Sequence, residues 1–71
     1  MTKQAELILA LETLVDANGL YAVTEALELV CYEKAEHLQV NWQDKPASKR
    51  WDRAGKAFRS AHAKLETIQL P

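Results

Sequence analysis

Apolar residues recur at intervals of three and four along most of the chain, which is the spacing of one face of an α-helix. This pattern predicts three helices, which cover residues 3–17, 20–40 and 46–67. Thr2 and Asp44 stand at N-cap positions, Pro46 suits a first helical turn, and Asn18-Gly19 is a typical helix stop. We therefore expect an all-α three-helix bundle, in which the two longer helices are antiparallel and the N-terminal helix is shorter.

Each expected helix has an apolar stripe that should face a core. In the first helix the stripe is formed by Leu7, Ile8, Leu11, Leu14 and Val15. The second helix has a broader arc, with Glu25, Glu28 and Glu36 on its solvent side and a main stripe of Leu20, Val23, Leu27, Val30, Cys31 and Leu38. An arc this broad favours contact with two neighbours, one of which could belong to another subunit.

The third helix has a narrower seam, whose apolar positions alternate steps of three and four. They are Trp51, Ala54, Phe58, Ala61, Leu65 and Ile68. A repeat close to 3.5 residues favours coiled-coil-like packing at a shallow crossing angle. Gly55 lies inside this helix, where it costs about 1 kcal/mol relative to alanine, so we expect a close approach of another helix to compensate.

The 71 residues are expected to form one small helical domain over 1–71. Domains of this size usually depend on disulfides, a metal or a second subunit. Cys31 is the single cysteine, which excludes an internal disulfide and fits a reducing compartment. No apolar run approaches the roughly 20 residues of a membrane span, and no signal-peptide pattern is present. We therefore expect a cytoplasmic homo-oligomer with no membrane partner.

The formal net charge of −1 hides a strong separation of charge along the chain. Residues 1–44 hold two basic and eight acidic residues, a net charge of −6, whereas residues 45–71 hold seven basic and two acidic residues, a net charge of +5. Five cations of the third helix cluster away from its seam at 100° per residue: Lys45, Lys49, Arg53, Lys56 and Lys64. Such a stripe is either a solvated face that keeps the protein soluble or a footprint for nucleic acid or for an acidic protein.

A second candidate surface lies on the C-terminal half of the second helix. Lys34, His37 and Asn41 interrupt its apolar arc there, and Trp42 follows in the connection. Two interpretations are open. Either the polar residues are satisfied structure, with Lys34 extended to solvent and His37 held by Glu33 or by a carbonyl, or they line a binding cleft beside the connection.

The spacing of candidate residues supports neither a metal site nor catalysis. Cys31 and His37 are six residues apart, so they lie about 120° from each other on a helix. His37 follows Glu33 by four residues, which is not the Glu-x-x-His spacing of di-iron bundles. The sequence has no converging Cys/His pair, no paired carboxylates and no glycine-rich phosphate loop. We expect a protein that is not an enzyme and that holds no metal or cofactor.

A resemblance to known proteins rests on four short segments and one tryptophan. They are Leu14-Val15-Asp16, Asn18-Gly19, residues 31–37 (CYEKAEH), Asn41-Trp42-Gln43-Asp44 and Trp51. Together they resemble small uncharacterised helical proteins of bacteria and of phages or other mobile elements. The resemblance covers most of the chain and implies a cytoplasmic location. It implies no particular activity and carries no catalytic residue to this sequence.

The leading hypothesis is a non-enzymatic helical protein-interaction module, homodimeric, which docks on a protein partner through its basic C-terminal helix. The residues expected to bind the partner are Lys49, Arg53, Lys56, Lys64, Lys34, His37 and Trp42. One alternative is a nucleic-acid-binding regulator that uses the same helix, although the acidic remainder of the chain would repel a polyanion. The other is a mobile-element inhibitor of a host enzyme.

Overall fold

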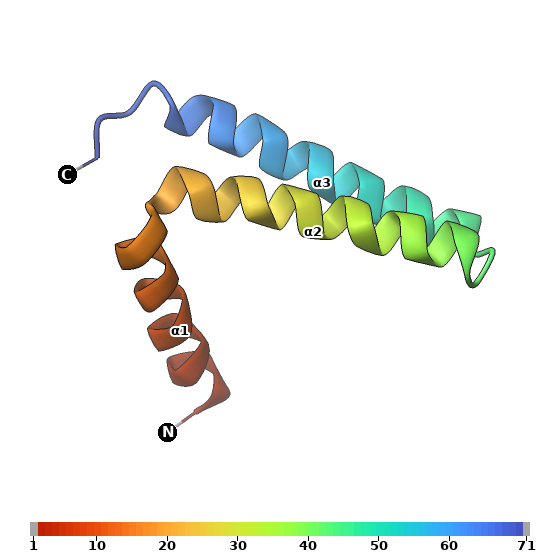
Figure 1. Ribbon diagram of the computed structural model, residues 1–71, viewed down its shortest axis with the longest axis horizontal. Helices are drawn as coiled ribbons and strands as arrows, with labels where there is room; N and C mark the ends of the chain where they lie inside the picture. The colour runs from red at the N-terminus through yellow and green to blue at the C-terminus, as the bar shows by residue number, and fades with distance from the viewer. Residues whose placement is uncertain (1, 71) are drawn as a thin grey trace.

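The computed structural model describes residues 2–70, and within that range the chain forms three helices and no strands. The helices are α1 (Lys3–Asn18), α2 (Leu20–Val40) and α3 (Lys45–Leu65). α2 and α3 lie side by side as an antiparallel hairpin, and α1 diverges from the start of α2 (Figure 1). The expected all-α class, with two longer antiparallel helices and a shorter N-terminal helix, is confirmed.

Local capping signals set the helix ends. The Thr2 hydroxyl and the Asp44 carboxylate each accept a hydrogen bond from the backbone N–H three residues further on, at 3.2 and 3.1 Å. These bonds satisfy amides that the start of a helix leaves unpaired. Between α1 and α2, Gly19 has a φ of 89°, which glycine adopts without the strain that a side chain would add. α3 ends at Leu65, two residues before its expected end.

The interface between α2 and α3 is built from small and polar residues. On α2 the buried positions advance by four, three and four residues: Thr24, Glu28, Cys31 and Ala35. On α3, Ser48 and Gly55 are buried, and Phe58, His62 and Leu65 are half-buried. The Ser48 hydroxyl donates a hydrogen bond to the Ala35 carbonyl at 2.7 Å. Small side chains at these positions allow the two helices to approach closely.

The expected close approach at Gly55 is confirmed. A Cβ atom built on Gly55 would overlap the ring of Tyr32 from α2, with Tyr32 Cδ1 only 2.8 Å away. The hydrogen that glycine carries in place of a Cβ therefore makes room for an aromatic ring between the helices.

Two predictions about this interface are wrong. The sequence pattern assigns Glu28 to the solvent side of α2, but Glu28 is only 8% exposed because it pairs with His62 of α3. The predicted main stripe of α2 also turns mostly away from α3, since Leu27 and Val30 are exposed and, of its six positions, only Cys31 is buried. Close packing selects the side of α2 with the smaller residues, which leaves the larger ones outside.

The predicted seam of α3 is partly right. Ala54, Phe58 and Leu65 are half-buried as predicted, but Trp51 is 39% exposed and the fully buried position next to Phe58 is Gly55. Ala61 and Ile68 are exposed, whereas His62 takes the inward position predicted for Ala61. The observed seam is therefore rotated by about one residue from the prediction at these positions.

α1 contributes no buried residue. The chain bends by 114° between α1 and α2, so α1 contacts α2 near the bend and does not pack on α3. The stripe expected to face the core is therefore uncovered: Leu7, Ile8, Leu11 and Leu14 are each 38–52% exposed. Within residues 2–70, no single helix has the length and hydropathy needed to cross a membrane, and α1 and α2 meet that standard only as a bent pair.

Candidate binding surfaces

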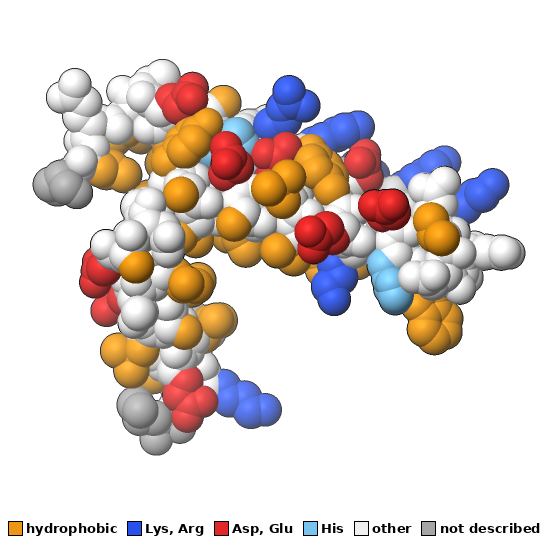
Figure 2. Space-filling model, viewed as in Figure 1, with side chains coloured by type: hydrophobic (Ala, Val, Ile, Leu, Met, Phe, Trp, Pro, Cys, Tyr) orange, Lys and Arg blue, Asp and Glu red, His pale blue; other side chains and the backbone are white. Residues whose placement is uncertain are grey.

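α3 carries its cations on the outer edge of the hairpin, where Figure 2 shows most of the blue side chains. Four of them form what we call the basic face: Lys49, Arg53, Lys56 and Lys64, all exposed. Lys49 and Arg53 are one helical turn apart and border the same shallow hollow beside Pro46. Lys64 lies about 22 Å from Lys49 along the helix axis, at 1.5 Å per residue. The basic face is thus an exposed row of cations along α3.

Within residues 2–70, one member of the basic face is paired with a carboxylate. Lys56 Nζ lies 3.0 Å from Asp52 Oδ2, one turn earlier in the same helix. The Lys56 side chain is 68% exposed, so water screens this pair and its contribution to stability is small. The remaining three cations have no carboxylate within 4.0 Å in that range. The excess acid of α1 and α2 therefore does not neutralise the basic face.

The structure brings together three of the four residues predicted for the polar surface at the end of α2, which are His37, Asn41 and Trp42. The Trp42 indole N–H donates a hydrogen bond to His37 Nε2 at 3.0 Å, and the Asn41 side-chain amide contacts His37 Nδ1 at 2.7 Å. The prediction that Glu33 or a carbonyl holds His37 is wrong, because the chain turns after α2 and returns the indole to the ring. Lys34 borders the same hollow as His37 but, among residues 2–70, forms no ion pair.

The bond from Trp42 fixes the protonation pattern of the His37 ring. An indole N–H can only donate, so Nε2 of His37 must be the acceptor and carry no proton. A neutral ring then carries its proton on Nδ1. The structure places the Asn41 amide nitrogen 2.7 Å from Nδ1, and a half-turn of the amide brings its oxygen there as the acceptor. Both ring nitrogens are thus engaged locally, which favours the interpretation of this surface as satisfied structure.

A third polar cluster is enclosed between α2 and α3, and the sequence did not single it out. The His62 ring donates from Nε2 to Glu28 Oε1 at 2.6 Å, and both side chains are nearly buried. This hydrogen bond holds the pKa of the Glu28 carboxyl below its ordinary value, although burial opposes the shift. The available signal was the spacing of seven residues that His62 shares with Ser48 and Gly55, the two buried positions of α3.

Two tyrosines flank this cluster. The Tyr21 ring meets His62 edge-on at 5.2 Å between centroids, and its hydroxyl donates to Glu66 at 3.0 Å, a bond that raises the pKa of Tyr21. Burial raises the pKa of Tyr32, and the nearby Glu28 carboxylate adds to the shift. The cluster thus links α2 to α3 through polar contacts and fixes the register of the two helices.

Across residues 2–70, no three His, Cys, Asp or Glu side chains converge where a metal could bind.

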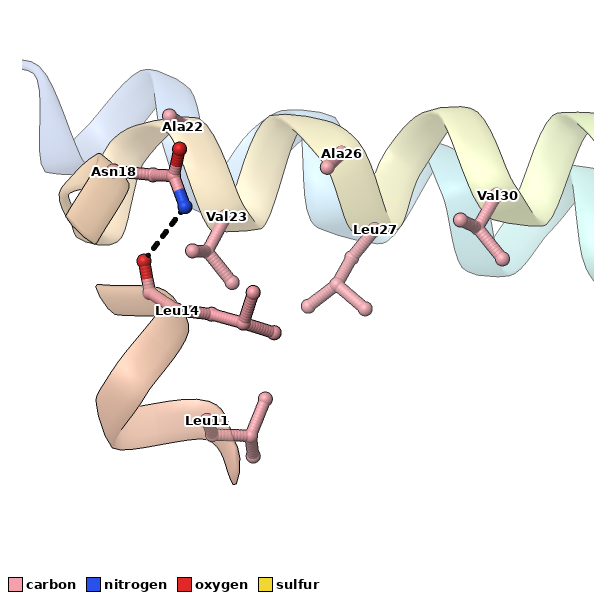
Figure 3. Close-up of a pocket in the computed structure, with 8 residues that line it drawn as sticks. All are labelled: Leu11, Leu14, Asn18, Ala22, Val23, Ala26, Leu27 and Val30. Atoms are coloured by element: carbon pink, nitrogen blue, oxygen red, sulfur yellow. Dashed lines mark hydrogen bonds between the residues drawn. The ribbon is translucent and has the colours of Figure 1, made fainter. Parts of the chain in front are cut away.

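A fourth surface lies at the inside of the bend between α1 and α2. We call it the apolar corner, and it encloses about 380 Å³. Its lining combines residues of both helices: Leu11, Leu14, Asn18, Ala22, Val23, Ala26, Leu27 and Val30. In Figure 3 the leucines of α1 point toward Val23 and Leu27 of α2, and no charged side chain is among the lining residues. The Asn18 amide N–H donates to the Leu14 carbonyl at 3.0 Å, so the polar member of the lining is partly satisfied.

No family model, no curated protein and no solved structure matches this chain. The resemblance to small helical proteins of bacteria and phages therefore stays a prediction. Function has to be argued from the surfaces themselves, which comprise the basic face, the polar surface around His37 and the apolar corner.

Proposed function

We propose that the protein is a non-enzymatic helical interaction module that docks on an acidic protein surface through the basic face of α3. The observation that carries this proposal is the lack of carboxylate partners for Lys49, Arg53 and Lys64 within residues 2–70, despite the eight acids of residues 1–44. Three unpaired cations in a row raise the local positive potential and favour a complementary acidic surface.

A protein partner fits the charge distribution better than a nucleic acid does. The part of the chain before α3 has a net charge of −6, so any polyanion longer than the basic face would also meet repulsion from α1 and α2. A folded partner can confine its negative charge to a patch that matches the roughly 22 Å row. Trp42 is 70% exposed beside the start of α3 and offers such a partner an aromatic contact.

The proposal is tested by capture from a nuclease-treated extract of the native cytoplasm with matched charge variants. Lys49→Glu combined with Arg53→Glu changes the net charge by four units on the basic face. The control, Lys3→Glu with Thr13→Glu and Gln69→Glu, makes the same change at exposed positions elsewhere. We expect the wild type and the control to retain the same protein, and the basic-face variant to lose it.

Two further measurements distinguish a protein partner from a nucleic acid: the dependence of retention on salt and the binding of the wild type to nucleic acid. Retention by the basic face should fall between about 0.05 and 0.5 M salt, because screening shortens the range of the interaction. If the basic-face variant retains the protein as well as the wild type does, the proposal is wrong. Wild-type binding to labelled duplex DNA or single-stranded RNA at low salt, lost in the same variant, would favour the nucleic-acid alternative instead.

A further inference from the structure

The apolar corner is a second surface, separate from the basic face of α3. We propose that it is the dimer interface of this protein, and that the apolar face of α1 from a second copy of the chain fills it. The inference does not depend on the acidic partner of α3. It depends on the surface that the chain leaves uncovered, the size of the opening and the chemistry of its lining.

The single chain exposes far more surface than a compact protein of its mass. A monomer of 8.0 kDa is expected to expose about 4,450 Å², whereas this chain exposes 5890 Å². Its radius of gyration is 14.4 Å, against about 11 Å for a compact domain of this length. The excess of about 1,400 Å² per chain amounts to about 2,900 Å² for two copies, which is within the range of obligate dimers. A second copy accounts for that excess.

The chain also lacks an apolar core of its own. Within residues 2–70 the buried apolar residues are Cys31 and Ala35, both small. Several of the larger apolar residues lie on α1 and on the side of α2 that faces the corner, where Leu11, Leu27 and Val30 are 37–45% exposed. A small domain reaches stability by covering such surface, and with one cysteine no internal disulfide can substitute for it.

The angle between α1 and α2 determines how far from the corner an inserted helix would lie. A bend of 114° leaves an angle of 66° between the two helices. A helix packed about 9 Å from both axes then meets each of them about 14 Å from the corner, or roughly nine residues from Gly19. That distance is level with Leu11 on α1 and Leu27 on α2, which are members of the lining. The apolar corner therefore presents its leucines where an inserted helix would lie.

α1 of a second copy has the chemistry that the corner requires. The lining has no charged residue, so the occupant must present an apolar face. α1 presents one about two turns long, from Leu7 to Leu14, and no residue of α1 is buried in the single chain. In a dimer with a twofold axis, α1 of each copy fills the apolar corner of the other, so both corners are covered.

The test is an isotope-filtered NOE experiment on the wild-type protein, prepared from equal amounts of ¹³C-labelled and unlabelled chain. We expect intermolecular NOEs between the methyl groups of Leu11 or Leu14 in one copy and those of Leu27 or Val30 in the other. Light scattering should give twice the 8.0 kDa mass of the chain. Either a mass of 8.0 kDa at 100 µM or a dimer whose intermolecular NOEs lie only on α3 would overturn the inference.

Single substitutions give a second readout. Leu11→Glu and Leu27→Glu each place a charge in the apolar corner and should weaken dimerisation by more than about tenfold. Leu9→Glu is the control, because Leu9 is a leucine of the same helix that is exposed but does not line the corner, and it should leave the dimer unchanged. If all three variants remain dimeric, the interface lies elsewhere. Should a variant lose its helical circular dichroism, the wild-type NOEs still decide the question.

Discussion

Replacing Gly55 by alanine sets helix propensity against packing at the closest approach of α2 and α3. In a helix interior, alanine is more favourable than glycine by about 1 kcal/mol. At this position, however, the added methyl group would meet the ring of Tyr32, with Cδ1 at 2.8 Å and Cζ at 3.0 Å. Three ring atoms lie within reach of the new carbon, so the ring or the helix has to move.

The magnitude follows from these two opposing terms. Overpacking of this kind typically costs about 1–3 kcal/mol, which exceeds the gain in propensity at the middle of the range. We expect Gly55→Ala to lower the free energy of unfolding by about 1 kcal/mol. In a Tyr32→Ala background the obstacle is gone, and the same substitution should stabilise the protein by about 1 kcal/mol.

The assay is urea unfolding followed by circular dichroism, at one protein concentration for every variant. A change of 1 kcal/mol moves the urea midpoint by up to about 1 M in a protein of this size. Ala57→Gly, at an exposed position of the same helix, serves as the control and should cost about 1 kcal/mol through propensity alone. If Gly55→Ala stabilises the protein in both backgrounds, the close contact between Gly55 and Tyr32 is refuted.

Three further predictions concern the polar contacts. Since His62 lowers the pKa of Glu28 below its ordinary 4.5, Glu28 stabilises the fold above that pH and loses this contribution as the pH falls through the lowered pKa. The melting temperature of the wild type should therefore fall more steeply on the acid side of pH 4.5 than that of Glu28→Gln. Nitrogen-15 NMR should find neutral His37 protonated on Nδ1, and an Nε2-protonated ring would contradict the bond from Trp42. Asp44→Ala removes the N-cap of α3 and should cost about 1 kcal/mol in urea unfolding; an unchanged midpoint would show that the cap is unimportant.

The helices could be predicted from sequence because their signals are local. Thr2, Gly19 and Asp44 act on amide groups within a few residues of themselves, so capping and the glycine stop are readable without tertiary structure. The result is that α2 begins and ends at the predicted residues, and α1 and α3 differ from the prediction by one or two residues at their ends.

The packing faces could not be predicted in the same way. Apolar periodicity selects the largest stripe on α2, around Leu27 and Val30, as the inner one, but close packing against Gly55 selects the smaller residues instead. The burial of Glu28 could not be predicted, because an isolated acid is expected to be exposed to solvent unless a partner such as His62 on another helix is known. For the same reason the sequence predicts the cations of the basic face but not whether a carboxylate approaches them.

The angle between α1 and α2 at Gly19 could not be predicted from the sequence either. A glycine stop marks where α1 ends, but the direction in which the next helix leaves depends on contacts that only the fold reveals. The sequence did indicate that the broad arc of α2 needs two neighbours. In the structure one of them is α3, and the other side of the arc forms the apolar corner.

Thermal unfolding as a function of protein concentration tests most directly whether the apolar corner is completed by a second copy. A chain that folds by associating with itself is stabilised by mass action, so its melting temperature rises with concentration. We predict such a rise between about 1 and 100 µM in the wild type, and a smaller rise in Leu11→Glu. A wild-type melting temperature that stays constant over that hundredfold range would contradict the account.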